Sequence, residues 1–144
     1  MKTWVKIILS LFVIGIIALV LGYVFVYNKS HPDYEKMKPD FTLTASDLYN
    51  SFQANATESE IKYNGKVIAI SGTLTKIEST DSLVIAVFVF NQGMFGEEGI
   101  RCTMLPKFND VAKKLQPENV YNIKGYCTGF NDPDVILEHC SIIK

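Results

Sequence analysis

The longest uninterrupted apolar run in the chain lies at its N-terminal end. Between Ile7 and Tyr27 there are 21 consecutive residues without a charged side chain. At a rise of 1.5 Å per residue, about 20 apolar residues in a helix cross a hydrocarbon core roughly 30 Å thick. Trp4 precedes the run and Tyr23 lies near its end, at the depths where amphipathic rings settle in a bilayer interface. We therefore predict a short basic N-terminus at residues 1–6 and a transmembrane anchor at residues 7–27.

A buried core helix and a cleaved signal peptide both fit this apolar run less well than a membrane anchor does. A core helix of such length would carry a polar face in so small a protein. A signal peptide would have a shorter apolar region and a cleavage site of the small-x-small type. Residues 23–28 offer no such site, and no cysteine stands there to receive a lipid. We favour an uncleaved signal-anchor, and a removed signal is the alternative.

The charges that flank the run bear on its orientation. Lys2 and Lys6 precede it, and Lys29, Lys36 and Lys38 follow it, so the positive-inside count is nearly tied. A signal-anchor with a short basic head usually leaves that head in the cytoplasm. We therefore expect a single-pass protein of the cell membrane, with its C-terminal domain on the extracytoplasmic side, either periplasmic or external.

All 15 acidic residues follow position 28, so the rest of the chain has a different composition. Residues 28–40 read as a polar tether, because Pro32 and Pro39 disfavour a helix in the residues before them. Residues 41–144 form the predicted folded domain. Its first element is a helix that begins after Thr44, which is placed to cap it with Asp47 three residues on, and ends near Asn55.

From residue 66 the apolar spacing changes from the helical period to the alternation of strands. Strands are predicted at residues 66–77, 83–90, 100–104, 121–127 and 135–143, with a helix at 106–116 and a glycine-rich connection at 91–99. Gly72 in mid-strand indicates a bulge or a bend. Five strands with one helix between the third and the fourth are typical of the OB-fold. The predicted fold class is all-β with accessory helices: a five-stranded Greek-key OB-fold-like barrel preceded by an α-helix, plus the N-terminal transmembrane helix.

Several short motifs of this domain also resemble the tRNA-anti-like family of bacterial OB-fold domains. They are Ala56, Tyr63–Gly72, Ile100–Cys102, Gly125–Gly129, Asp134–Leu137 and Cys140. The resemblance covers Thr44 to Ile143 and implies an OB-type barrel with a preceding helix. Members are frequently membrane-anchored or lipoprotein-borne, and this chain has a hydrophobic span where others carry a lipidated cysteine. The family supplies no catalytic residues, and its name does not establish nucleic-acid binding.

The three cysteines, Cys102, Cys127 and Cys140, have no C-x-x-C spacing, which argues against a zinc or redox motif. In an OB barrel the third and fifth strands are neighbours, so a disulfide between Cys102 and Cys140 is geometrically conceivable. Three thiols packed as small hydrophobic groups are the alternative that we favour. An oxidising compartment would favour the disulfide.

We find no catalytic constellation, metal site or cofactor motif, and we predict that the protein is not an enzyme. His139 and Cys140 are neighbours on one strand, so their side chains face opposite ways and cannot form a nucleophile–base pair. Residues 131–134 with Glu138 lack the ligand spacing of a calcium site. The glycine-rich stretch at residues 93–99 has no lysine or hydroxyl partner for a phosphate, and reads as a hairpin tip with Met94 and Phe95 exposed.

Nucleic-acid binding is the first function that an OB-fold suggests, and the charge of the domain opposes it. From residue 40 onward there are 9 Lys and Arg against 13 Asp and Glu, a net charge of −4. Most non-specific affinity for nucleic acid comes from basic groups along the backbone path.

Two functions therefore stand as hypotheses. The first is a non-enzymatic binding module at the outer face of the membrane that contacts a protein or an oligosaccharide, with Phe95, Arg101, Tyr126 and Phe130 as candidate ligand-binding residues. This rests on analogy with the usual ligand side of the fold. The second is single-stranded nucleic-acid (RNA or DNA) binding by a domain that faces the cytoplasm.

Overall fold

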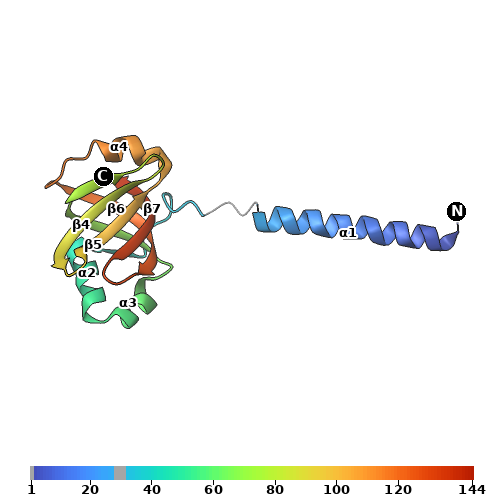
Figure 1. Ribbon diagram of the computed structural model, residues 1–144, viewed down its shortest axis with the longest axis horizontal. Coiled ribbons are helices and arrows are strands. Elements are labelled where there is room, and N and C mark those ends of the chain that lie inside the picture. Colours follow the sequence, from blue (N-terminus) through green and yellow to red (C-terminus); the bar gives the residue numbers. More distant parts are fainter. Residues whose placement is uncertain (1, 28–31) are drawn as a thin grey trace. The chain divides into compact units, whose positions relative to one another are not determined.

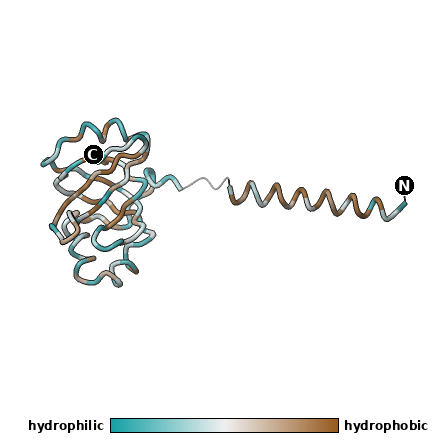
Figure 2. Tube along the Cα trace, in the orientation of Figure 1, coloured by the Kyte–Doolittle hydropathy of each residue, from teal (hydrophilic) through white to brown (hydrophobic). Residues whose placement is uncertain are grey.

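The computed structural model describes residues 2–27 and 32–144. It divides into two compact units, residues 1–32 and residues 33–144, each described here by itself. In the first unit, helix α1 spans Thr3–Tyr27, with a mean hydropathy of 2.9 over its most apolar stretch and no buried residue. Figure 2 shows the brown of apolar residues along nearly all of it. Its length and composition are those of a membrane span, and a signal sequence shares them.

The second unit begins with two short helices. Helix α2 spans Ala45–Ala54, and the Thr44 hydroxyl accepts a hydrogen bond from the Asp47 N–H at 3.1 Å, which confirms the predicted cap. Its apolar stripe, with Leu48 and Phe52, is buried. Helix α3, Ala56–Tyr63, was not predicted. It starts at Asn55, whose side-chain oxygen accepts from the Glu58 N–H at 3.2 Å and whose amide donates back to the Glu58 carboxylate.

One mixed sheet of seven strands, in the order β1-β2-β6-β7-β5-β4-β3, forms the body of the unit (Figure 1). The strands are β1 Phe41–Thr44, β2 Val67–Thr73, β3 Lys76–Ser79, β4 Val84–Gly93, β5 Gly96–Met104, β6 Val120–Phe130 and β7 Val135–Ile143. The pairs β1–β2 and β5–β7 are parallel, and the other pairs are antiparallel. A 3₁₀ turn, Pro106–Phe108, and helix α4, Asn109–Lys113, connect β5 to β6.

Each of the five predicted strands is found, but the five-stranded Greek-key arrangement is not confirmed, because the sheet has seven strands. The predicted first strand is divided into β2 and β3 at residues 74–75, and β1 adds an edge strand that the sequence did not indicate. The predicted glycine-rich connection at residues 91–99 is wrong. There β4 and β5 stay paired as far as Gly93 and Gly96, so only Met94 and Phe95 form the turn.

The core lies between the sheet and the helices at its two ends. Figure 1 shows α4 at one end of the sheet and α2 with α3 at the other. The largest fully buried side chains include Phe52, Phe88, Leu74 and Ile100. A Cβ at Gly72 would lie 2.7 Å from the Ala45 Cβ, so this glycine lets α2 approach β2 closely.

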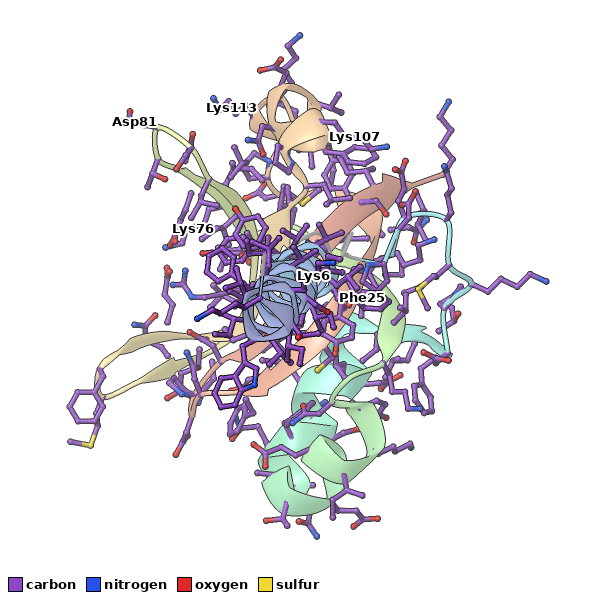
Figure 3. The ribbon with its side chains drawn as sticks, turned by 90° about the vertical axis from the view of Figure 1, so that its right-hand side faces the viewer. Lys6, Phe25, Lys76, Asp81, Lys107 and Lys113 are labelled. Carbon is purple, nitrogen blue, oxygen red and sulfur yellow. The ribbon has the colours of Figure 1, made fainter. Side chains whose placement is uncertain are left out.

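We predict that Gly125→Ala destabilises the folded unit by about 1–3 kcal/mol, the usual cost of an added methyl group in a filled core. A Cβ there would lie 2.5 Å from the Cys140 sulfur and 3.2 Å from the Leu137 Cβ. Thermal unfolding of the full chain in detergent would measure the loss. Lys113→Ala, on an exposed position of α4 (Figure 3), serves as the control. An unchanged melting temperature for Gly125→Ala would contradict this packing.

Candidate functional site

Arg101, a predicted ligand-binding residue, lies on β5 between two carboxylates. Its Nη1 donates to a Glu78 oxygen at 2.6 Å, and its Nε donates to an Asp134 oxygen at 3.0 Å. Glu78 is on β3 and Asp134 stands just before β7. The ion-pair cluster therefore links β3 and β5 to the start of β7. Lys76 joins it through Glu78 at 3.3 Å and through Glu97 (Figure 3 labels Lys76).

The cluster holds three carboxylates and two cations, and its cations are already paired. Hydrogen bonding from the Arg101 guanidinium lowers the pKa of Glu78, against the opposing effect of partial burial. Hydrogen bonding to Glu78, and then to Asp134, raises the pKa of Arg101. The Lys76 pKa is raised first by its hydrogen bond to Glu97. A phosphate at this surface would meet a net negative charge instead of an available guanidinium.

Phe95 lies at the tip of a hairpin arm formed by the outer halves of β4 and β5, which stay paired as far as Gly93 and Gly96. Its side chain is 100% exposed, and that of Met94 is 95% exposed. The arm is braced at its base by α2, because the Tyr49 ring stacks on Phe90 with centroids 5.3 Å apart. The Tyr49 hydroxyl also donates to Glu98 at 3.3 Å. Burial, and then the Glu98 charge, raises the pKa of Tyr49.

Tyr126, on β6, is covered by another part of the chain. The Tyr34 ring stacks on it with centroids 4.5 Å apart, and Tyr34 also lies 5.2 Å from the His139 ring. Beside them Lys124 is only 8% exposed, and its ammonium donates to the main-chain oxygens of Glu35 and Met37. Residues 33–38 therefore rest on the sheet over Tyr126.

Phe130, at the end of β6, stacks on Phe52 of α2 with centroids 5.4 Å apart. It borders an open hollow of about 230 Å³ that Asn64, Thr128 and Asn131 also line. In the sheet register Phe130 faces Val135 of β7. The hollow offers amide and hydroxyl groups beside an aromatic edge.

The four predicted residues do not converge on one ligand position. Arg101 and Phe130 lie on the strands to either side of β7, opposite neighbouring residues of that strand. Phe95 belongs to the arm, and Tyr126 to the surface under residues 33–38. Sequence reasoning missed Tyr34, Lys124, Glu78 and Asp134 as partners of these residues. The position of Lys124 in an alternating strand indicates a solvent-facing side chain, so no local signal marked it.

The three thiols are free and buried. Burial raises the pKa of Cys140 well above its ordinary range, and the neighbouring Cys102 thiol adds to this effect. Burial likewise raises the pKa of Cys127 to about 11. Cys102 and Cys140 are therefore neighbours as expected, and the disulfide between them stays the less favoured alternative to three buried thiols. Among residues 2–27 and 32–144, no group of three or more His, Cys, Asp or Glu side chains is placed to hold a metal ion.

The protein is thus a small domain built on one mixed sheet, preceded in the chain by an apolar helix. The chain belongs to the tRNA_anti-like family of OB-fold domains, whose family model matches residues 1–142. This confirms the resemblance drawn from the sequence motifs.

Three solved structures match parts of this chain at low sequence identity. A "putative nucleic acid-binding lipoprotein" from Klebsiella pneumoniae is 18% identical, with a TM-score of 0.54 over 81% of this chain and 100% of that one. An OBody bound to hen egg-white lysozyme is 14% identical, with a TM-score of 0.39 over 58% and 80% of the two chains. The aspartyl tRNA synthetase of Entamoeba histolytica is 13% identical, with a TM-score of 0.44 over 81% and 23%. No curated protein matches the sequence.

We predict that Glu78→Gln lowers stability at pH 7 by about 0.5 kcal/mol, a usual size for a partly exposed ion pair. The folded-state pKa of Glu78 lies below the ordinary value of 4.5, so its charge stabilises the fold above that value. The difference from the wild type should shrink as the pH falls below about 4.5 and vanish once Glu78 is protonated in the folded state. Urea unfolding at pH 7, 4 and 3 would measure it.

Asp81→Asn is the control, because Asp81 is an exposed carboxylate on the turn after β3 (Figure 3). A wild-type advantage over Glu78→Gln that persists unchanged at pH 3 would contradict the ion-pair account.

Proposed function

We propose that this protein is a single-pass membrane protein that displays a non-enzymatic OB-type binding domain on the extracytoplasmic side and contacts another protein. The observation that carries the proposal is the fully exposed Phe95, beside an equally exposed Met94, at the tip of a braced arm. An oligosaccharide remains the other ligand class for an extracytoplasmic domain, with the hollow beside Phe130 as its site. Residues 7–27, within α1, are the proposed anchor.

In the proposed OB-type closure, the segment that holds β2 and β3 joins the two sides of the sheet formed by the five long strands. Only Leu74 and Thr75 separate β2 from β3, which lie near opposite ends of the strand order. The Thr75 N–H donates to the Val87 oxygen of β4 at 3.0 Å, and the Leu74 N–H donates to the Asn119 oxygen, next to β6, at 2.9 Å. These contacts support a bent first strand shared by both halves of a small barrel.

The arm has the properties of a protein contact. An aromatic side chain that is already exposed and held on a rigid hairpin loses little conformational freedom when it binds. The positive φ at this turn belongs to Gly96, at +128°, so Met94 and Phe95 carry no backbone strain and the tip presents their two apolar side chains. Glu98 lies near the tip with the neutral groups of Tyr49 and Asn91 as hydrogen-bond donors, and its charge favours a partner whose apolar pocket has a basic rim.

The second candidate function is binding of single-stranded nucleic acid by a domain on the cytoplasmic side. The description of the Klebsiella protein as a "putative nucleic acid-binding lipoprotein" favours this candidate. The paired state of Arg101 and Lys76 opposes it, because binding there would break ion pairs before it could form phosphate contacts.

We predict that a reporter enzyme fused after Lys144 is active when it requires an oxidising, extracytoplasmic environment and inactive in its cytoplasm-dependent form. The full chain in cells is the material, and the matched pair of reporters controls for expression. The opposite pattern of activity would place the domain in the cytoplasm and overturn the proposed side.

We predict that a photo-crosslinking residue at position 95 of the full chain, in native membranes, gives one discrete protein adduct. The same residue at Leu83, which is 47% exposed, is the matched control and should give none. Phe95→Ala should weaken binding of the captured protein about 30-fold, because an anchoring aromatic is worth about 2 kcal/mol. Equal adducts at both positions would contradict the proposed contact, and an RNA adduct would favour the second candidate.

A further inference from the structure

Residues 33–38, hereafter the strap, are attached to the sheet by several side-chain contacts. The Tyr34 ring lies against Tyr126 with an interplanar angle of 27°, and its other neighbour is the His139 ring. The carboxylate of Glu35 pairs with Lys107, next to α4 (Figure 3). An aromatic stack and an ion pair thus hold the first part of the strap.

Lys124 holds the main chain of the strap. Its ammonium donates to the Glu35 oxygen at 2.6 Å and to the Met37 oxygen at 2.7 Å, on either side of Lys36. A lysine that is 92% buried would be costly without partners, and these two carbonyl groups are the partners that it has in the structure. Because carbonyl oxygens belong to every peptide, this recognition does not depend on the strap's own side chains.

The strands beneath the strap are irregular at this place. The β6–β7 register shifts between Lys124 and Tyr126, and His139 takes a left-handed φ of +53°. Such a conformation is costly for a residue with a side chain, and it persists where the surroundings favour it, often at functional positions. Here it accompanies the surface that contacts Tyr34.

The strap itself buries little apolar surface. Only Tyr34 and Glu35 are half-buried, and the other strap residues are exposed. The next fixed point along the chain is Asp40, whose N–H donates to the Val67 oxygen at 2.7 Å and whose carboxylate accepts from the Val67 N–H at 2.9 Å. With so little apolar burial, the strap depends on the Tyr34 stack, the Glu35 ion pair and the bonds from Lys124, so it can open locally while the sheet stays folded.

We propose that Tyr126, His139 and Lys124 form a binding site for an extended peptide that carries an aromatic side chain, and that the strap is its resident occupant. A partner protein inserts its aromatic ring on Tyr126, its carbonyl groups accept from Lys124, and the strap is displaced. This inference rests on the proposed function, in which the partner is a protein. It adds a second contact to the one at Phe95.

The first test uses trypsin on the full chain in lipid nanodiscs. The bond between Lys36 and Met37 lies between the two carbonyl groups bound by Lys124, so cleavage there requires release of the strap. Tyr34→Ala should speed this cleavage about fivefold to tenfold, the factor that loss of one aromatic stack gives when opening is fast. Leu83→Ala, which removes an exposed apolar side chain elsewhere, should leave the rate unchanged. A synthetic peptide of residues 31–40, with and without the alanine, corrects for any change in trypsin preference.

The second test asks whether the site accepts a peptide in trans. A fluorescein-labelled peptide of residues 32–40 is titrated into full-length protein by anisotropy. Binding should be about tenfold tighter to Tyr34→Ala than to the wild type, in which the strap competes. It should be lost when Lys124→Met is added, and lost for a peptide with alanine in place of its tyrosine.

Equal cleavage rates in the first test, or equal or absent peptide binding to Tyr34→Ala and wild type in the second, would overturn the proposal. Displacement of the strap by a short uridine oligonucleotide, with no binding of the peptide, would overturn the peptide assignment. The site would then be one for a nucleic-acid base. Neither test needs the partner or the orientation in the membrane. If these two tests fail, the crosslinking at position 95 and the reporter fused after Lys144 still decide the proposed function on their own.

Discussion

The pairing of residues 67–79 with two different strands is the constraint on which the rest of the sheet depends. Its first part, β2, is bonded to β6, and its last part, β3, is bonded to β4. Between them Leu74 is fully buried, and Gly72 leaves room for α2. A straight strand could not serve both partners, so the bend here fixes where β4 and β6 lie. Through them it fixes the arm, the ion-pair cluster and the surface under the strap.

Much of the fold followed from local patterns, because burial on one or both faces leaves a clear spacing of apolar residues. The cap at Thr44, the helix that follows it and the positions of the five longest strands were predicted in this way. The misses were elements with little apolar content of their own. Strand β1 has four residues and forms by parallel pairing with β2, and α3 depends on its Asn55 cap more than on a buried face.

The surfaces were harder to predict than the fold because their chemistry comes from long-range partners. Arg101 was predicted as a ligand-binding residue, but its partners Glu78 and Asp134 come from positions 23 and 33 residues away. No local signal in the sequence singles out Lys124, because its partners lie 87 and 89 residues earlier in the chain. Phe95 is the exception. Its exposure at a hairpin tip depends only on adjacent residues, so the sequence could predict it.

The charge distribution of this domain disfavours the polyanions that an OB-type sheet often recognises. An excess of carboxylates makes association with a polyanion depend on a local basic surface, and the ion-pair cluster uses two cations of the sheet internally. The two contacts that we propose use groups of another kind: an apolar tip, an aromatic face and a lysine that binds carbonyl groups. These groups suit the main chain and apolar side chains of a protein better than phosphates. The strap already uses the last two in this way, because the chain's own peptide satisfies Tyr126 and Lys124 together.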